Sequence, residues 1–196
     1  MLTVYIDFKS PACYLALLPT LALAEKYQVD IEWRAFKTVE RPIPKLAGRE
    51  ELSLRHNQVR DLSKRKLFEK YAERQGIDLK FPSRSQEPSL ALAVLNQLSA
   101  KRTDFVKLAF KAFWEAHENL DDADVVKSLL GKCGLPQDSF DEDKVRQQYD
   151  RDLEKAYASG IVEAPAYFID QQLFIGREHF PWIEEILNSK TRFKDK

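Results

Sequence analysis

The chain has 196 residues, 44% of them hydrophobic, and its 31 basic residues balance its 31 acidic residues. A chain of this length buries a sizeable core as one domain, or as one domain with an insertion. Balanced charge gives no reason to expect binding to nucleic acid or to an anionic membrane. No apolar run reaches the ~20 residues that a membrane-spanning helix requires, and the N-terminus has no signal-peptide pattern. We therefore expect a cytoplasmic protein.

The sequence contains two cysteines, Cys13 and Cys133, and three histidines, His56, His117 and His179. Two cysteines are too few for a disulfide framework, and none of these residues has the spacing of a metal site. We expect no metal. Cys133, between glycine-rich flanks, is typical of a small structural residue, and the sequence leaves a bridge between the two cysteines open.

A β-branched and aromatic run over 2–8 predicts a buried strand, and a Leu- and Ala-rich run over 15–27 predicts a buried helix. Between them, Ser10 suits the N-cap of that helix and Pro11 its first position, because proline has no N–H to leave unpaired. Unpaired N–H groups and the macrodipole at this helix end favour a thiolate. Pro19, inside the helix, predicts a kink or a break.

Residues 29–36 alternate apolar and polar and predict a half-buried strand, which completes a βαβ unit. A loop at 41–44 then leads into a helical middle of the chain. Two short strands at 164–169 and 173–175 flank a hairpin turn at 170–172, and a last helix is expected over 178–187. The middle helices are predicted over 50–75 (charged and exposed), 88–98, 104–118, 122–130 and 141–159.

The stretch Ser10-Pro11-Ala12-Cys13-Tyr14 resembles the active-site turn of the thioredoxin superfamily, in its DsbA-like branch. That turn reads Cys-Pro-x-Cys followed by an aromatic residue, and here a serine replaces the first cysteine. Ser-Pro-x-x-Tyr after Asp-Phe is similar to the glutathione-dependent subgroup, the 2-hydroxychromene-2-carboxylate isomerases and kappa-class glutathione transferases. The resemblance implies that Ser10 contacts the sulfur of glutathione.

The order βαβ, helical block, ββα agrees with this resemblance. It implies an α/β, thioredoxin-like fold with a large all-helical insertion. Residues 1–37 and 160–196 would form the thioredoxin-like domain, and residues 38–159 the insertion.

A second motif, Ala164-Pro165 at the start of a strand, is similar to the segment that faces the active-site turn in this superfamily. Without that context a trans proline is the default. The resemblance implies a cis bond, with the N–H and C=O of Ala164 free to pair with glutathione.

Three further sets of residues are candidates for the site. The resemblance implies that Glu178 receives the γ-glutamyl amino group, although it also suits the first turn of a helix as an ordinary acid. Arg177 either binds a carboxylate in a two-pronged contact or lies free on the surface. Asn57 and Arg60 are loose matches to carboxylate-binding residues of the subgroup.

These features predict a glutathione-dependent isomerase or transferase whose helical block supplies a pocket for a small hydrophobic or aromatic substrate. The resemblance also allows a homodimer. Two alternatives remain open: a thiol–disulfide oxidoreductase that uses the single Cys13, and a binding module without turnover.

Overall fold

 The computed structural model describes residues 1–39, 50–83 and 86–194. The loop expected at 41–44 lies outside these residues.

The sheet has four strands in the order β2-β1-β3-β4. They are β1 (Leu2–Ile6), β2 (Ile31–Ala35), β3 (Ala166–Ile169) and β4 (Gln172–Ile175). β1 runs parallel to β2 and antiparallel to β3, and β3 runs antiparallel to β4. Because β1 lies between β2 and β3, the βαβ unit and the C-terminal hairpin share one sheet. The strands at 2–8 and 29–36 are confirmed, each slightly shorter than predicted.

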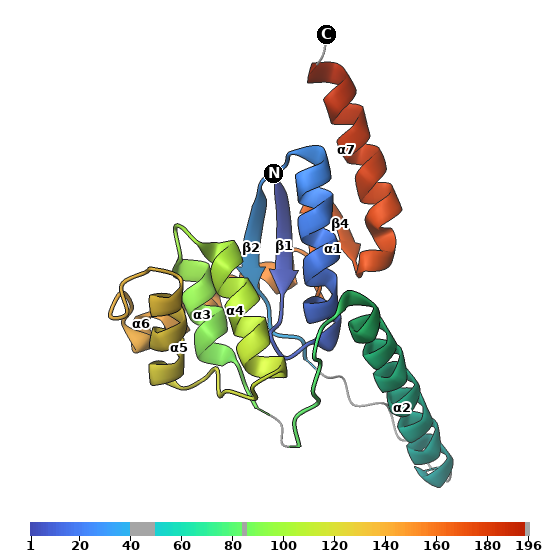
Figure 1. Cartoon of the computed structure of the whole chain (residues 1–196). Coiled ribbons are helices and arrows are strands. Elements are labelled where there is room, and N and C mark those ends of the chain that lie inside the picture. The colour runs from blue at the N-terminus through green and yellow to red at the C-terminus, as the bar shows by residue number, and fades with distance from the viewer. Residues whose placement is uncertain (40–49, 84–85, 195–196) are drawn as a thin grey trace.

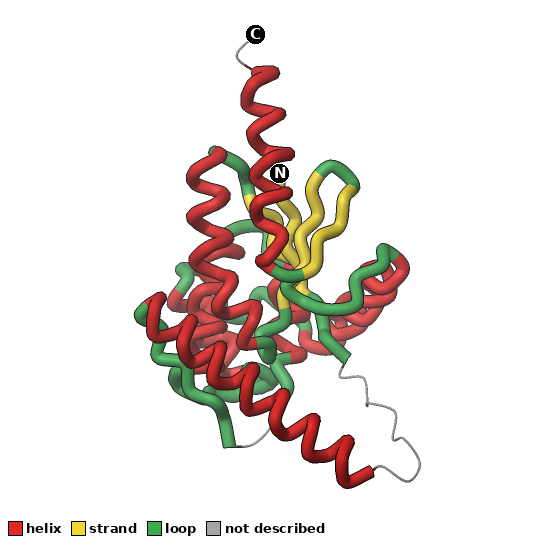
Figure 2. The backbone as a smooth tube through the Cα atoms, turned by 90° about the vertical axis from the view of Figure 1, so that its right-hand side faces the viewer, coloured by secondary structure: helices red, strands yellow, loops and turns green. Residues whose placement is uncertain are grey.

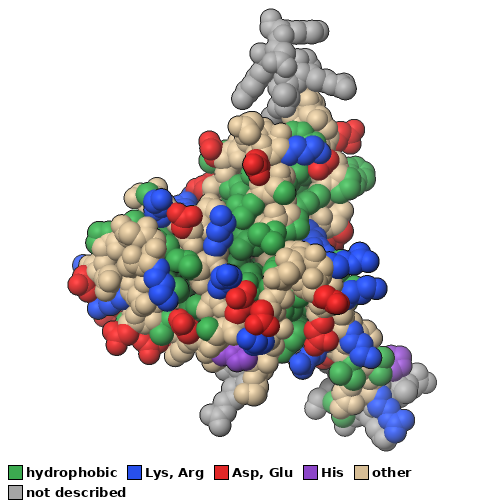
Figure 3. Space-filling view, viewed as in Figure 1, with side chains coloured by type: hydrophobic (Ala, Val, Ile, Leu, Met, Phe, Trp, Pro, Cys, Tyr) green, Lys and Arg blue, Asp and Glu red, His purple; other side chains and the backbone are tan. Residues whose placement is uncertain are grey.

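Helix α1 (Pro11–Tyr27) lies across one face of the sheet, beside α7 (Phe180–Lys194). The inward side chains of β1, Leu2, Val4 and Ile6, are almost fully buried beneath it. In the space-filling view, hydrophobic side chains gather over α1 along the middle of this face (Figure 3). This packing fixes the N-terminus of α1 at the carboxyl end of β1, where the candidate site lies.

The described residues in the middle of the chain form the helices α2 (Glu50–Gln75), α3 (Ser89–Gln97), α4 (Arg102–Trp114), α5 (Ala123–Lys132) and α6 (Glu142–Ala158). Helices α3 to α6 form a group beside β2, in which α3 packs against β2 and α6 (Figure 1). Helix α2 instead extends away from the sheet, and α7 extends from the opposite end of the molecule (Figure 2). The side chains over 54–67 are almost all exposed, as predicted for this helix.

This arrangement is the thioredoxin-like fold with a helical insertion, so the predicted fold class is confirmed. The boundaries of the insertion at 38 and 159 remain a prediction. Both cysteines are free, so the bridge between Cys13 and Cys133 is absent from the structure. Among the described residues, no helix is long and apolar enough to cross a membrane.

Three local predictions need correction. Helix α1 continues through Pro19, so of the predicted kink or break the break is wrong and the kink stays a prediction. The helix expected over 104–118 ends at Trp114, and His117 has a left-handed φ of 56°. The last helix begins at Phe180 after a 3₁₀ turn, η1 (Arg177–His179), and runs to Lys194. Pro181, which suits a first helical turn, is the sequence signal for that later start.

Candidate functional site

The turn between β1 and α1 presents the Ser10 side chain at the first turn of the helix. Ser10 is the N-cap, and its Oγ accepts a hydrogen bond of 3.3 Å from the Cys13 N–H. Pro11 follows as the first helical residue, so the first helical N–H belongs to Ala12. The N–H groups of a first turn have no intrahelical acceptor and attract negative charge. The predicted capping by Ser10 is confirmed.

Buried contacts hold this turn in place from below. The Asp7 carboxylate accepts hydrogen bonds from the Lys9 N–H at 2.9 Å and the Thr38 N–H at 3.0 Å. Burial raises the pKa of the Asp7 carboxyl above its ordinary value, although those two N–H donors act in the opposite direction. The Trp114 indole N–H donates to the Phe8 carbonyl at 2.9 Å. The turn is therefore held both through the Asp7 side chain, by the Thr38 N–H, and through the Phe8 carbonyl, by the Trp114 indole.

Cys13 faces the core and not the surface of the turn. Its side chain is 1% exposed, and its Sγ accepts a hydrogen bond from the Asp7 N–H at 3.4 Å. Burial raises the pKa of the Cys13 thiol far above its ordinary value, which outweighs the donors near it. Because the thiolate is the nucleophile in cysteine chemistry, Cys13 is a poor reactive residue at neutral pH.

The Ala164–Pro165 segment lies directly against Ser10. The bond between these residues is cis, as the resemblance implied. The Ser10 hydroxyl donates to the Ala164 carbonyl over 3.5 Å, a long contact that leaves the hydroxyl free to turn. The Pro165 carbonyl accepts a hydrogen bond of 2.8 Å from the Gly176 N–H. This bond brings the segment after β4 up to the same turn.

A cavity of about 140 Å³ opens beside the turn. Its walls come from α1, the cis proline, α2 and the segment after β4. The lining residues are Ala12, Leu15, Phe68, Tyr71, Pro165, Gly176, Arg177 and Glu178. Ser10 is not among them, but Ala12 and Pro165 on either side of it are. The predicted residues Pro165, Arg177 and Glu178 are thus brought together in one pocket.

Arg177 and Glu178 give this largely apolar pocket one positive and one negative group. The Arg177 guanidinium lies over the Tyr71 ring, 4.1 Å from its centroid, and donates to the Leu15 carbonyl at 3.4 Å. The Glu178 carboxylate folds back over Gly176, where any Cβ would overlap it. The φ of 88° favours glycine at position 176, whereas the flexible Glu178 side chain can move away from an added Cβ. Among the described residues, neither charged group forms an ion pair.

The weaker candidates lie elsewhere. Asn57 and Arg60 are on the outlying part of α2 and do not line the pocket. The His117 ring contacts the Lys80 carbonyl at 3.0 Å and so helps to hold the loop before α3. The described residues contain no group of three potential metal ligands.

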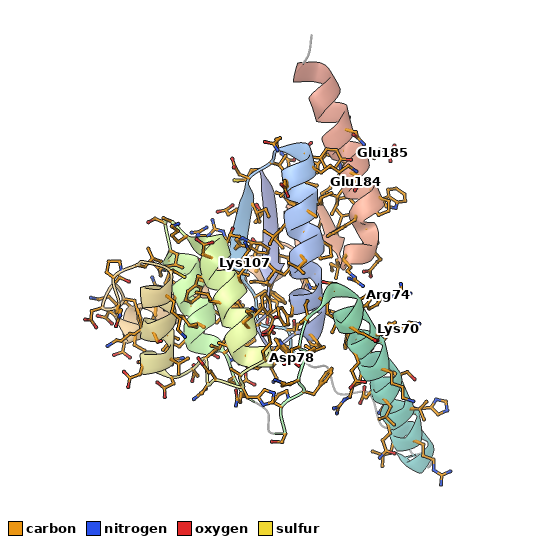
Figure 4. All side chains as sticks on the ribbon, in the orientation of Figure 1. Lys70, Arg74, Asp78, Lys107, Glu184 and Glu185 are labelled. Carbon is orange, nitrogen blue, oxygen red and sulfur yellow. The ribbon has the colours of Figure 1, made fainter. Side chains whose placement is uncertain are left out.

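Two aromatic lining residues of α2, Phe68 and Tyr71, were not predicted as site residues. They lie three positions apart, so they share one face of an otherwise charged helix. That spacing is the signal that could have identified them. On the same helix, the side chains of Lys70 and Arg74 project into solvent (Figure 4).

The fold and the candidate site together define a class: a thioredoxin-fold protein with a serine at the N-cap of α1, next to a cis proline. The match to the family model named "DSBA-like thioredoxin domain" spans residues 1–188. The chain belongs to that family.

Individual relatives show two activities within this family. The chain is 28% identical to 2-hydroxychromene-2-carboxylate isomerase from Sphingobium xenophagum, over 93% of this chain and 95% of the relative. A solved 2-hydroxychromene-2-carboxylate isomerase has a similar fold, with a TM-score of 0.78 at 19% identity, covering 99% of this chain and 97% of that one. The cytosolic disulfide reductase DsbM from Pseudomonas aeruginosa, solved with GSH, has a TM-score of 0.60 at 17% identity, covering 97% and 98%.

Proposed function

We propose that the protein is a glutathione-dependent enzyme that isomerises a small conjugated or aromatic substrate, or conjugates it as a kappa-class transferase does. The observation that carries the proposal is the placement of the Ser10 hydroxyl. It lies at the N-terminus of α1 and faces the carbonyl of Ala164, which precedes a cis proline. The likeness to 2-hydroxychromene-2-carboxylate isomerase supports the isomerase in particular.

Ser10 is suited to hold the sulfur of glutathione. Its Oγ accepts the Cys13 N–H, and its proton makes only a long contact of 3.5 Å with the Ala164 carbonyl, from which it can turn to a sulfur. A hydroxyl that accepts one hydrogen bond becomes a better donor in another. The Ala12 N–H and the positive end of the α1 dipole also stabilise negative charge on the sulfur. The bound thiol therefore has a lowered pKa and is thiolate at neutral pH.

The rest of glutathione has complementary groups nearby. In this proposal the backbone of its cysteine pairs with Ala164, as an added strand pairs with a sheet edge. Its γ-glutamyl end enters the cavity, where Glu178 receives the ammonium group and Arg177 the carboxylate. The presence of GSH with the related DsbM supports glutathione as the ligand of this fold.

The isomerisation involves no net oxidation. The thiolate adds to the electron-poor carbon of a conjugated double bond, which forms a C–S bond and moves an electron pair onto the substrate carbonyl oxygen. The former double bond is now single and rotates. The enolate then returns its electron pair, the C–S bond breaks, and the thiolate leaves unchanged. In a transferase the enolate would instead take up a proton, and the sulfur would stay bound.

Thiol–disulfide exchange through Cys13 is the second candidate, because solved disulfide reductases share the fold. It needs an accessible thiolate. Cys13 is buried with a raised pKa, and no second cysteine stands in the turn. These observations favour the isomerase. We place the activity in the cytoplasm, and a homodimer is compatible with it.

The proposal is tested by product analysis. The purified protein is incubated with 2-hydroxychromene-2-carboxylate, with and without glutathione, and the isomer ratio is followed. We expect conversion that requires glutathione, is lost in Ser10→Ala and persists in Cys13→Ala. Glutathione-independent conversion, or insulin reduction that disappears in Cys13→Ala, would contradict the proposal.

A further inference from the structure

Pro19 leaves a backbone acceptor open in the wall of the pocket. A residue inside an α-helix normally donates its N–H to the carbonyl four positions earlier, and proline has no N–H to donate. The carbonyl that loses its partner here is that of Leu15, a lining residue of the cavity. It accepts instead from the Gln75 side-chain amide at 3.1 Å and from Arg177 at 3.4 Å.

The same guanidinium is held from a second direction. Tyr71 lies one helical turn before Gln75 on α2, and its ring lies 4.1 Å from the Arg177 guanidinium carbon. A cation over an aromatic face is attracted by the ring. The Leu15 carbonyl accepts from one N–H group of the guanidinium, and the Tyr71 ring covers one of its faces. Its other N–H groups donate to no acceptor among the described residues and are available to a ligand.

Arg177 and Glu178 are neighbours in sequence, line the same cavity and form no ion pair among the described residues. A ligand end with one anionic and one cationic group, separated by a single carbon, complements such a pair. An α-amino acid has this chemistry. In glutathione only the γ-glutamyl end carries it.

We propose that Pro19, through the Leu15 carbonyl, and Tyr71 are positioning residues that hold Arg177 for the α-carboxylate of glutathione's γ-glutamyl end. The pocket thereby selects thiols that carry a free α-amino acid. This inference rests on the proposed function and adds to it the basis of thiol selection. Neither positioning residue contacts the reacting sulfur.

The test compares two ligands by calorimetry: glutathione, and γ-aminobutyryl-cysteinylglycine, which lacks only the α-carboxylate. The wild-type protein should bind glutathione at least about tenfold more tightly, because a charge-assisted contact is lost in the analogue. Arg177→Gln should bring this ratio close to one. Tyr71→Leu and Pro19→Ala should each lower it about two- to tenfold, whereas Tyr71→Phe, which keeps the ring, should preserve it.

Thermal unfolding supplies the control for folding. Pro19→Ala restores the helical hydrogen bond to Leu15 and should raise the unfolding midpoint. Weaker glutathione binding by this more stable variant would therefore be a local effect on Arg177. Equal weakening of both ligands in Pro19→Ala and Tyr71→Leu, or a wild-type ratio of one, would overturn the inference and leave glutathione dependence standing. Binding of neither ligand would overturn the proposed function itself.

Discussion

The start of α1, which follows the β1–α1 turn, and helix α2 both line one pocket, but the turn and α2 are held in different ways. The turn rests on buried partners, with Phe8 fully enclosed and its carbonyl bonded to Trp114. Helix α2 is exposed along most of its length and is held near its C-terminal end, where Ala72 is buried and Gln75 bonds to Leu15. In the proposed function, the firmly held turn supplies Ser10 for the sulfur of glutathione, and the loosely held α2 helps to select the thiol that binds.

The largest effect should follow a change in the firmly held turn. Ser10→Ala removes the hydroxyl that holds the sulfur, and we expect glutathione-dependent turnover to fall by about 10²-fold or more. Loss of the helix cap should also lower the free energy of unfolding by about 1 kcal/mol. Initial rates and denaturant unfolding measure the two effects.

Cys13→Ala is the matched control in the same turn. It should lower stability by about 1–3 kcal/mol through lost packing and the unpaired Asp7 N–H, yet change turnover by no more than about twofold, because the buried thiol has no role in the proposed mechanism. A rate loss in Cys13→Ala as large as that in Ser10→Ala would show that the two residues share the chemistry.

The support under the turn gives the next effect. Trp114→Phe leaves the buried Phe8 carbonyl without its donor, which should cost about 1–3 kcal/mol and weaken glutathione binding. Trp33→Phe is the comparison, because that indole donates to Thr103 at 2.9 Å, away from the site. It should lower stability similarly and leave binding unchanged. If both variants lost glutathione binding equally, the Trp114 hydrogen bond would not be what holds the turn in its binding geometry.

Helix α2 should respond on a smaller scale. Gln75→Met keeps helix propensity but removes the donor to Leu15, at a cost of about 1 kcal/mol. Amide hydrogen exchange should quicken in α2 and stay unchanged in α1. Gln148→Met removes the bond to Asp152 within α6 and should leave α2 exchange as it was. Faster exchange across α1 as well would mean that the two walls are held as one unit.

The smallest effect is a pH dependence of stability. The pKa of Asp7 is raised by burial, so the wild-type protein loses stability as pH rises from the ordinary aspartate pKa, about 3.9, through the higher folded value. Asp7→Asn lacks this loss, and its stability relative to wild type should therefore rise over that window. Denaturant unfolding from about pH 4 to pH 7 measures it.

Asp141→Asn provides the opposite sign. Lys144 lowers the pKa of Asp141, whose contribution to stability is present above the ordinary pKa and lost as pH falls through the folded value. Below about pH 4, under the window used for Asp7, Asp141→Asn should therefore lose stability relative to wild type as pH rises, whereas Asp7→Asn gains it in its own window. A parallel response would contradict the assigned burial of Asp7.

Much of the turn could be predicted from sequence because its signals are local. Ser10 and Pro11 are cap residues wherever a helix begins, and the order of elements follows hydrophobic periodicity. The role of Cys13 could not be predicted in this way, since its burial depends on packing between distant segments. The pocket wall was missed for a similar reason: Tyr71 meets Arg177 only when α2 lies against α1.

Pro19 illustrates the limit most clearly. The sequence indicates a lost helical hydrogen bond, and a kink or a break was the local expectation. The helix instead continues, because Gln75 and Arg177, distant in sequence, supply the missing donors to the Leu15 carbonyl. A local rule identified the unpaired carbonyl but not its partners.

The central claim is that Ser10 and the N-terminus of α1 stabilise the thiolate of bound glutathione. The most direct test is the thiolate absorbance of glutathione, read as a difference spectrum with the protein over a pH series, for wild type and Ser10→Ala. The account predicts that the pKa of the bound thiol lies at least about one unit below the ~8.5 of a free thiol, and that Ser10→Ala returns it most of the way. An unshifted pKa in the wild-type complex, or the same shift in both proteins, would contradict the account.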